Sequence, residues 1–234
     1  MGRGGNIHRA VWVTLDVLLS RYRFRLLILS AVTALLGAGV AATMTHLPAP
    51  NPLLRILAPD GITLTREELA NPDTAAGLNN MVRVLESAHR PIPEYLRLVC
   101  AEYSGKPRET ARFSVGCYWE GERELGKIPG VVASRTGIVG REEVVEVEFD
   151  PKVIDAEALA GRAKRLTCFR GVPSTQATLV ESDDQKHTLA NHPELANVLM
   201  TPMQQTKVNA ALWDGEDLAR ILSPRQLRLA KNRE

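Results

Sequence analysis

The alternation of apolar and polar residues is clearest over residues 142–149, which read Glu-Glu-Val-Val-Glu-Val-Glu-Phe. A period of two is typical of a β-strand, whose successive side chains point to opposite faces. One face is expected to carry Glu143, Val145, Val147 and Phe149, and the other mostly Glu142, Val144, Glu146 and Glu148. One carboxylate therefore shares the apolar face of this strand.

Helical patterns occur on both sides of this strand. Asp73 is expected to cap a helix that continues with apolar residues at helical spacing until Pro91, and Asp155 is expected to cap a helix that ends near Leu166. Residues 201–204 (Thr-Pro-Met-Gln) and 223–226 (Ser-Pro-Arg-Gln) match capping boxes with proline in the first helical position. The predicted order from residue 113 is strand, helix, strand, strand, helix, which indicates an α+β sandwich.

The longest apolar run, residues 26–44, holds nineteen residues without a charge. As a helix it would be roughly 28 Å long, close to the hydrocarbon thickness of a bilayer. Arg21, Arg23 and Arg25 precede it, so the positive-inside rule predicts a cytoplasmic N-terminus and a domain on the extracytoplasmic, periplasmic side. A cleaved signal peptide, with small residues at 41–43, and a buried soluble helix are the alternatives.

The segments predicted from these patterns divide the chain into five parts. They are a cytoplasmic N-terminal segment (1–25), a single transmembrane anchor (26–44), a stiff, partly extended linker (45–64), an accessory helical segment (65–110) and the main domain (111–234).

Composition adds limits on function. The chain has 234 residues, of which 44% are apolar, so it can bury a proper core. Its formal net charge of +2 selects no partner. No basic run is interleaved with aromatic residues and no cysteine spacing suits zinc, so neither nucleic acid nor a metal is expected.

Cys117 is the main candidate for chemistry. It follows an apolar strand and Gly116, and it opens a predicted helix. The unpaired N–H groups and the dipole at a helix N-terminus favour a thiolate, which is the reactive form of cysteine. A small buried hydrophobic residue is the alternative for any single cysteine, and it is the preferred interpretation of Cys100.

Three motifs carry a resemblance to a known family. Residues 116–123 (Gly-Cys-Tyr-Trp-Glu-Gly-Glu-Arg), 129–131 (Pro-Gly-Val) and 143–151 resemble the peptide methionine-(S)-sulfoxide reductases, whose nucleophile lies in Gly-Cys-Phe-Trp. The resemblance covers about residues 113–166. It implies a ferredoxin-like two-layer sandwich, an oxidised protein or peptide as substrate, no bound cofactor, and an external thiol reductant such as a thioredoxin-like protein.

The resemblance also implies roles for individual residues. The Cys117 thiolate attacks the sulfoxide sulfur, Glu143 protonates the oxygen, and Tyr118 and Trp119 form the wall for the substrate methyl group. Burial on an apolar face independently favours the neutral form of Glu143, as a general acid requires, although this residue near the strand start can instead face solvent or pair with Arg141.

The sulfenic acid left on Cys117 needs a second thiol, and Cys168 is the candidate for that resolving role.

The sequence departs from the family pattern at three places. Tyr118 replaces the usual phenylalanine. A long loop that carries one oxygen-binding tyrosine in the family is reduced to residues 137–141, and Lys186 stands where the family has a second such tyrosine. Asp184 and His187 are candidates to bind substrate in place of the missing tyrosines. A non-catalytic interaction domain, or a thiol oxidoreductase with another substrate, remains an alternative function.

Overall fold

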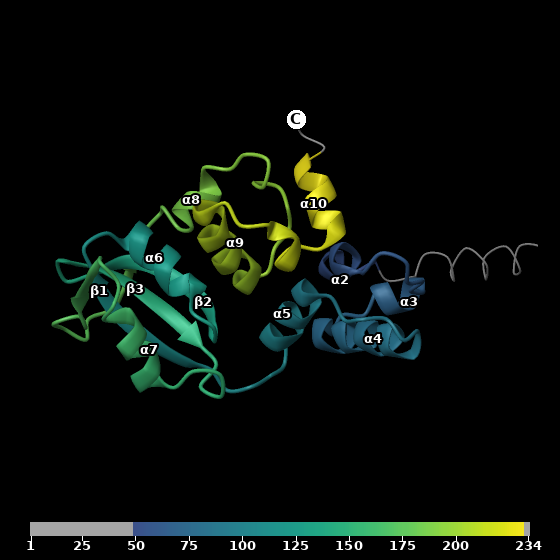
Figure 1. Ribbon diagram of the computed structural model, residues 1–234, viewed down its shortest axis with the longest axis horizontal. Helices are drawn as coiled ribbons and strands as arrows, with labels where there is room; N and C mark the ends of the chain where they lie inside the picture. Colours follow the sequence, from purple (N-terminus) through teal and green to yellow (C-terminus); the bar gives the residue numbers. More distant parts are fainter. Residues whose placement is uncertain (1–48, 232–234) are drawn as a thin grey trace, which may run out of the picture. The chain divides into compact units, whose positions relative to one another are not determined.

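The computed structural model describes residues 49–231 (Figure 1). The chain divides into two units, Met1–Ala49 and Pro50–Glu234, and the description below concerns the second. The predicted segments 1–25 and 26–44 lie outside the described residues, so the membrane anchor stays a prediction. Within residues 49–231, no helix combines the length and the apolar character needed to cross a bilayer.

The second unit mixes helices with one antiparallel sheet, so the α+β class is confirmed (Figure 1). Its elements are α2 (Pro52–Leu57), α3 (Arg66–Leu69), α4 (Thr74–Ser87), α5 (Glu94–Glu102), β1 (Glu109–Val115), α6 (Tyr118–Lys127), β2 (Val131–Val139), β3 (Glu142–Phe149), α7 (Ala156–Ala163), β4 (Phe169–Gly171), β5 (Val180–Glu181), α8 (His187–Ala190), α9 (Pro202–Asp214), a 3₁₀ helix η1 (Leu218–Arg220) and α10 (Pro224–Lys231).

The five strands run in the order β4-β1-β3-β2-β5. The central strand β3 places Glu143 opposite Val115 of β1 on one side and opposite Ile138 of β2 on the other. Val139 and Glu142 are paired, so only two residues turn the hairpin between β2 and β3. Gly140 takes φ +64° in this turn, a conformation that glycine adopts without steric cost. The connection between β2 and β3 is therefore short, as the sequence predicted.

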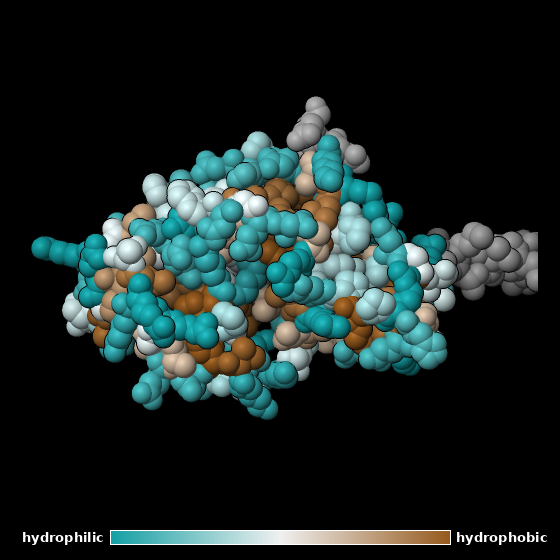
Figure 2. All heavy atoms as spheres, viewed as in Figure 1, coloured by the Kyte–Doolittle hydropathy of each residue, from teal (hydrophilic) through white to brown (hydrophobic). Residues whose placement is uncertain are grey.

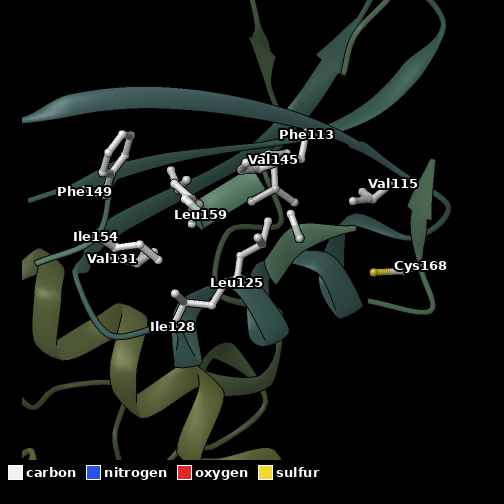
Figure 3. Packing of buried hydrophobic residues seen from close by; sticks show 12 residues of the cluster. Phe113, Val115, Leu125, Ile128, Val131, Val145, Phe149, Ile154, Leu159 and Cys168 are labelled. Atoms are coloured by element: carbon white, nitrogen blue, oxygen red, sulfur yellow. The ribbon is translucent and has the colours of Figure 1, made fainter. Parts of the chain in front are cut away.

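The helices α6 and α7 bury one face of the sheet (Figure 3). Leu125 from α6 and Leu159 from α7 pack on Val145 and Phe149 of β3, and all four side chains are at most 1% exposed. Burial of each such side chain is worth about 1.5–3 kcal/mol. The predicted apolar face of β3 is therefore confirmed, and it places Glu143 on the side of the sheet that α6 covers.

A second apolar cluster joins α2, α4 and α5. Leu54 of α2 is fully buried there, and a Cβ added to Gly77 of α4 would lie 2.3 Å from it, so the two helices touch closely. The prediction of an extended linker over 45–64 is therefore wrong for α2. Pro52 occupies the first turn of this helix and Asn51 caps it, so a proline that suggested an extended spacer instead starts a helix.

The predicted caps are present. Asp73 and Asp155 accept hydrogen bonds from the first turns of α4 and α7, and Thr201 and Ser223 form reciprocal bonds with the glutamines three residues later. In Figure 2 hydrophilic residues cover most of the visible face and apolar residues form separate patches between them.

Candidate functional site

Cys117 lies between the end of β1 and the start of α6. It is the N-cap residue of α6, with φ −150° and ψ 117°, and its side chain makes no capping hydrogen bond. The residue is partly exposed and its thiol is free. The prediction that Cys117 opens a helix is therefore confirmed. Its thiol lies at the helix N-terminus, the positive end of the helix dipole, and forms no hydrogen bond that caps the helix.

Glu143 contacts the same turn of helix. Its Oε2 atom accepts a hydrogen bond from the Tyr118 backbone N–H at 2.8 Å. This N–H belongs to the first turn of α6, where backbone donors lack helical partners. Glu143 forms no ion pair with Arg141 within residues 49–231. The carboxyl group is thus hydrogen-bonded to the backbone of the residue that follows Cys117.

Cys168 lies beside the strand end that leads to Cys117. Its carbonyl oxygen accepts a hydrogen bond from the Gly116 N–H at 2.7 Å, and the next residue pairs with Val115 as part of β4. The Cys168 side chain is only 3% exposed and belongs to the core beneath the sheet (Figure 3). Burial, followed by the negative charge of Glu120, raises the pKa of the Cys168 thiol.

Cys100 lies elsewhere, in α5. It packs against the apolar cluster of α2, α4 and α5, and burial raises the pKa of its thiol. This placement agrees with the interpretation of Cys100 as a core residue.

Trp119 and His187 form an aromatic stack. Their ring centroids are 3.9 Å apart with planes inclined by 12°, and Trp119 is 41% exposed. The His187 Nδ1 atom lies 2.8 Å from Asp184 Oδ2, and the Asn191 amide lies 3.2 Å from His187 Nε2. Both ring nitrogens therefore have partners, so His187 contributes a stacking surface and not an open hydrogen-bond donor.

The Lys186 side chain is held by groups of α6 and β2. Its ammonium group binds Glu122 Oε1 at 2.7 Å and the Ser134 carbonyl at 2.6 Å, and its backbone N–H binds Glu122 Oε2 at 2.9 Å. The Glu122 side chain is 1% exposed and that of Lys186 is 13% exposed. Lys186, where the resemblance implies a tyrosine, is therefore part of a buried ion pair with Glu122 of α6.

The segment before Lys186 also closes the outer edge of β2. The Gln185 side chain accepts a hydrogen bond from the Thr136 N–H at 2.9 Å and donates one to the Thr136 carbonyl at 2.7 Å. Such side-chain contacts cover an edge that would otherwise expose backbone groups.

Three residues near the site were not identified from the sequence. Ser182 donates to the Tyr118 hydroxyl at 3.2 Å, Glu122 binds Lys186, and the guanidinium of Arg170 lies where a Cβ on Gly116 would meet its Nη2 atom at 2.6 Å. Each contact joins segments far apart in the sequence, and no local pattern signals it. Within residues 49–231, no group of three or more His, Cys, Asp or Glu residues is arranged to hold a metal ion.

The geometry defines an α+β protein with a candidate thiol site, in which Cys117 at a helix N-terminus adjoins the Glu143 carboxyl group and aromatic side chains. No family model matches the chain. The chain is 37% identical over 68 residues to the peptide methionine sulfoxide reductase MsrA of Rippkaea orientalis. The matched segment covers 22% of this chain and 31% of that protein.

Two further comparisons agree. MsrA 1 of Caulobacter vibrioides is 40% identical over 68 residues, covering 22% of this chain and 31% of that protein. MsrA 1 of a Nostoc species is 33% identical over 70 residues, covering 23% of this chain and 43% of that protein. The chain thus spans about a third of the length of the relatives it matches. Over this segment it is related to the peptide methionine sulfoxide reductases.

Proposed function

We propose that this protein reduces methionine-S-sulfoxide in oxidised proteins by a thiol-dependent reaction at Cys117. The observation that carries the proposal is the hydrogen bond from the Tyr118 N–H to Glu143, because it fixes a carboxyl group beside the helix N-terminus that holds the free thiol. The relationship to the MsrA proteins supports the same chemistry.

In the first step the Cys117 sulfur attacks the sulfoxide sulfur while Glu143 protonates the oxygen. The S–O bond of the substrate breaks, methionine leaves, and the oxygen remains on Cys117 as a sulfenic acid. Two electrons pass from the thiol to the substrate sulfur. Tyr118 and Trp119, whose rings meet edge to face at 6.0 Å, provide the wall for the methyl group.

In the second step the Cys168 thiol attacks the Cys117 sulfur, water leaves, and a disulfide forms. The bond between Gly116 and Cys168 supports this pairing. This contact places Cys168 opposite the residue that precedes Cys117, and a disulfide requires the two cysteine Cα atoms to approach to about 4.4–6.8 Å. An external dithiol, such as a thioredoxin-like protein, then reduces the disulfide and restores both thiols.

The proposal extends to the fold type and the location. We infer that β1, α6, β2, β3 and α7 form a two-layer sandwich of the MsrA type. We also infer that residues 26–44 anchor the domain on the extracytoplasmic side of a membrane. In intact cells, added protease should cleave the domain and leave residues 1–25 intact; protection of the domain would refute this orientation.

One observation favours a second candidate, a thiol oxidoreductase with another substrate. Lys186 occupies the family tyrosine position but is bound to Glu122 and Ser134, so it is not available to bind a sulfoxide oxygen. A pocket altered in this way would suit a substrate other than a sulfoxide, which would react with the same cysteines, Cys117 and Cys168.

The decisive experiment incubates the purified full-length chain with peptide-bound methionine-S-sulfoxide, methionine-R-sulfoxide or a peptide disulfide, together with a small dithiol. Methionine formed only from the S-sulfoxide supports the proposal. The Cys117→Ser variant, which keeps the size but removes the nucleophile, should be inactive. Turnover of the disulfide alone would favour the second candidate.

A further inference from the structure

The Arg170 side chain of β4 lies against the glycine that precedes Cys117. A Cβ added to Gly116 would lie 2.6 Å from Arg170 Nη2, 2.9 Å from its Cζ and 3.2 Å from its Nε. The guanidinium group therefore packs directly on the Gly116 backbone, and any larger residue at position 116 would displace it. The glycine leaves room for a cation beside the candidate nucleophile.

Two backbone carbonyls hold one end of this guanidinium group. Arg170 Nη1 donates to the Phe169 carbonyl at 3.1 Å and to the Thr167 carbonyl at 3.3 Å. Within residues 49–231, Nε and Nη2 form no hydrogen bond and Arg170 forms no ion pair. Arg170 is also exposed, so the two nitrogens nearest Gly116 keep free N–H donors.

The free donors and the charge of this group match a carboxylate. The Nε–H and one Nη2–H of a guanidinium are parallel and can donate to both oxygens of one carboxylate, which makes the contact stronger and more specific than a single hydrogen bond. The Nη1 contacts with Phe169 and Thr167 hold the group in place before a ligand arrives. Arg170 is therefore suited to bind an anionic group of a ligand at the site.

The distance from Arg170 to Cys117 limits where that carboxylate lies in a substrate. Neighbouring Cα atoms are about 3.8 Å apart and a C–C bond is about 1.5 Å long, so the 2.6 Å contact places Arg170 Nη2 no farther than about 8 Å from the Cys117 Cα atom. The substrate sulfur must approach the Cys117 sulfur to about 3–3.5 Å. An extended chain advances about 3.3–3.6 Å per residue, so Arg170 can reach a carboxylate one or two residues from the reacting methionine.

We propose that Arg170 is a specificity-determining residue that binds a carboxylate of the substrate chain one or two residues from the methionine sulfoxide. This inference rests on the proposed function and adds a substrate class to it, namely peptides with an acidic residue beside the oxidised methionine. A free C-terminal carboxylate at the same distance has the same chemistry. No bond to Arg170 forms or breaks during the reaction.

The charges around Arg170 limit the size of the effect. Glu120 accepts a hydrogen bond from the hydroxyl of Thr167, the residue whose carbonyl holds Arg170, at 2.8 Å. This carboxylate, and that of Glu143 at the Tyr118 N–H, oppose an acidic ligand. The new ion pair is also open to solvent and screened by salt. We therefore expect an acidic neighbour to raise kcat/KM by roughly three- to tenfold at low salt.

The test compares amidated peptides of one length that carry Glu, Gln or Lys on either side of methionine-S-sulfoxide. Wild type should prefer the Glu peptide to the Gln peptide on at least one side, and the preference should shrink at about 0.5 M salt. Arg170→Gln should abolish the preference, and Arg170→Glu should reverse it in favour of Lys. The control Arg97→Glu makes the same change in net charge at an exposed position of α5 and should keep the preference.

The preference is a ratio of two kcat/KM values for the same variant, so it does not depend on how much of that variant is folded. A wild type with no preference, or an Arg170→Gln variant with the same preference, overturns the inference and leaves the proposed function standing. Peptides that end in methionine-S-sulfoxide, with a free or an amidated C-terminus, show whether the terminal carboxylate also binds. If it binds, its effect should be lost in Arg170→Gln as well.

A wild type that forms no methionine refutes the proposed function and leaves the binding role of Arg170 to be measured directly. Fluorescently labelled sulfoxide peptides are then titrated with the Cys117→Ser variant, and binding is followed by anisotropy. Tighter binding of the Glu peptide than of the Gln peptide, lost when Arg170→Gln is added, supports the carboxylate contact. Equal binding of the two peptides refutes it.

Discussion

Replacing Lys186 with methionine tests the buried ion pair under α6. Methionine keeps an unbranched side chain of similar length and removes only the ammonium group. The Glu122 carboxylate, 1% exposed, then loses the bond at 2.7 Å that neutralises its charge, and the Ser134 carbonyl loses its bond at 2.6 Å. Neither group gains access to solvent in compensation.

The expected cost follows from burial and from the remaining contacts. Removing one partner of a buried ion pair typically costs about 3–5 kcal/mol, because an uncompensated charge is left behind. Glu122 still accepts bonds from the Lys186 backbone N–H at 2.9 Å and from the Ser134 hydroxyl at 3.1 Å. These contacts place the expected loss near the lower end, at about 3 kcal/mol.

Urea unfolding followed by tryptophan fluorescence measures this loss. The control is Lys127→Met, since Lys127 also contacts carboxylates, Glu124 at 2.9 Å and Asp214 at 2.7 Å, but is one-third exposed. Surface pairs of this kind contribute about 0–1 kcal/mol. In the double variant Glu122→Gln with Lys186→Met the charge is gone, so its loss should be smaller than the sum of the single losses. A Lys186→Met cost no larger than that of Lys127→Met would refute the reasoning.

Three other predictions concern the site and the α5–α9 contact. Glu143→Gln keeps the shape but cannot deliver a proton, so turnover should fall by roughly 10²- to 10⁴-fold, and unchanged turnover would remove Glu143 from the mechanism. One equivalent of sulfoxide should give a Cys117–Cys168 disulfide by mass spectrometry; a pair with Cys100 would refute the resolving role.

Burial raises the pKa of Glu102, whose Oε2 atom has no hydrogen-bond partner within the described part of the chain, so the folded state binds its proton more tightly. The free energy of unfolding should then fall as pH rises from the ordinary glutamate pKa through the raised one, and Glu102→Gln should remove this part of the slope in urea titrations.

Local patterns were sufficient for the elements that frame the site. The alternation over residues 142–149 predicted the strand and the face of Glu143, because burial on one side of a sheet enforces a period of two. The glycine and cysteine after β1 predicted the start of α6, and Asp155 predicted the start of α7. Each of these signals acts over a few residues.

The rest of the site depends on contacts that local patterns do not encode. The strands β4 and β5 have three and two residues, too short to show a period, and they exist because β1 and β2 present open edges. Ser182 meets Tyr118 across 64 positions of sequence, and Lys186 meets Glu122 across 64 as well. The sequence around Lys186 did not indicate that its ammonium group binds the buried Glu122.

The segment of residues 182–186 covers the open edge of β2 and also contacts the candidate site. The open edge of β2 needs donors and acceptors, and the segment around Gln185 supplies them through side chains. Because Lys186 completes the same cover by binding the Ser134 carbonyl, it is not free to reach a substrate. Ser182, at the start of the same segment, is hydrogen-bonded to the Tyr118 hydroxyl at 3.2 Å. The segment that covers the edge of β2 therefore also contacts the residue that follows Cys117.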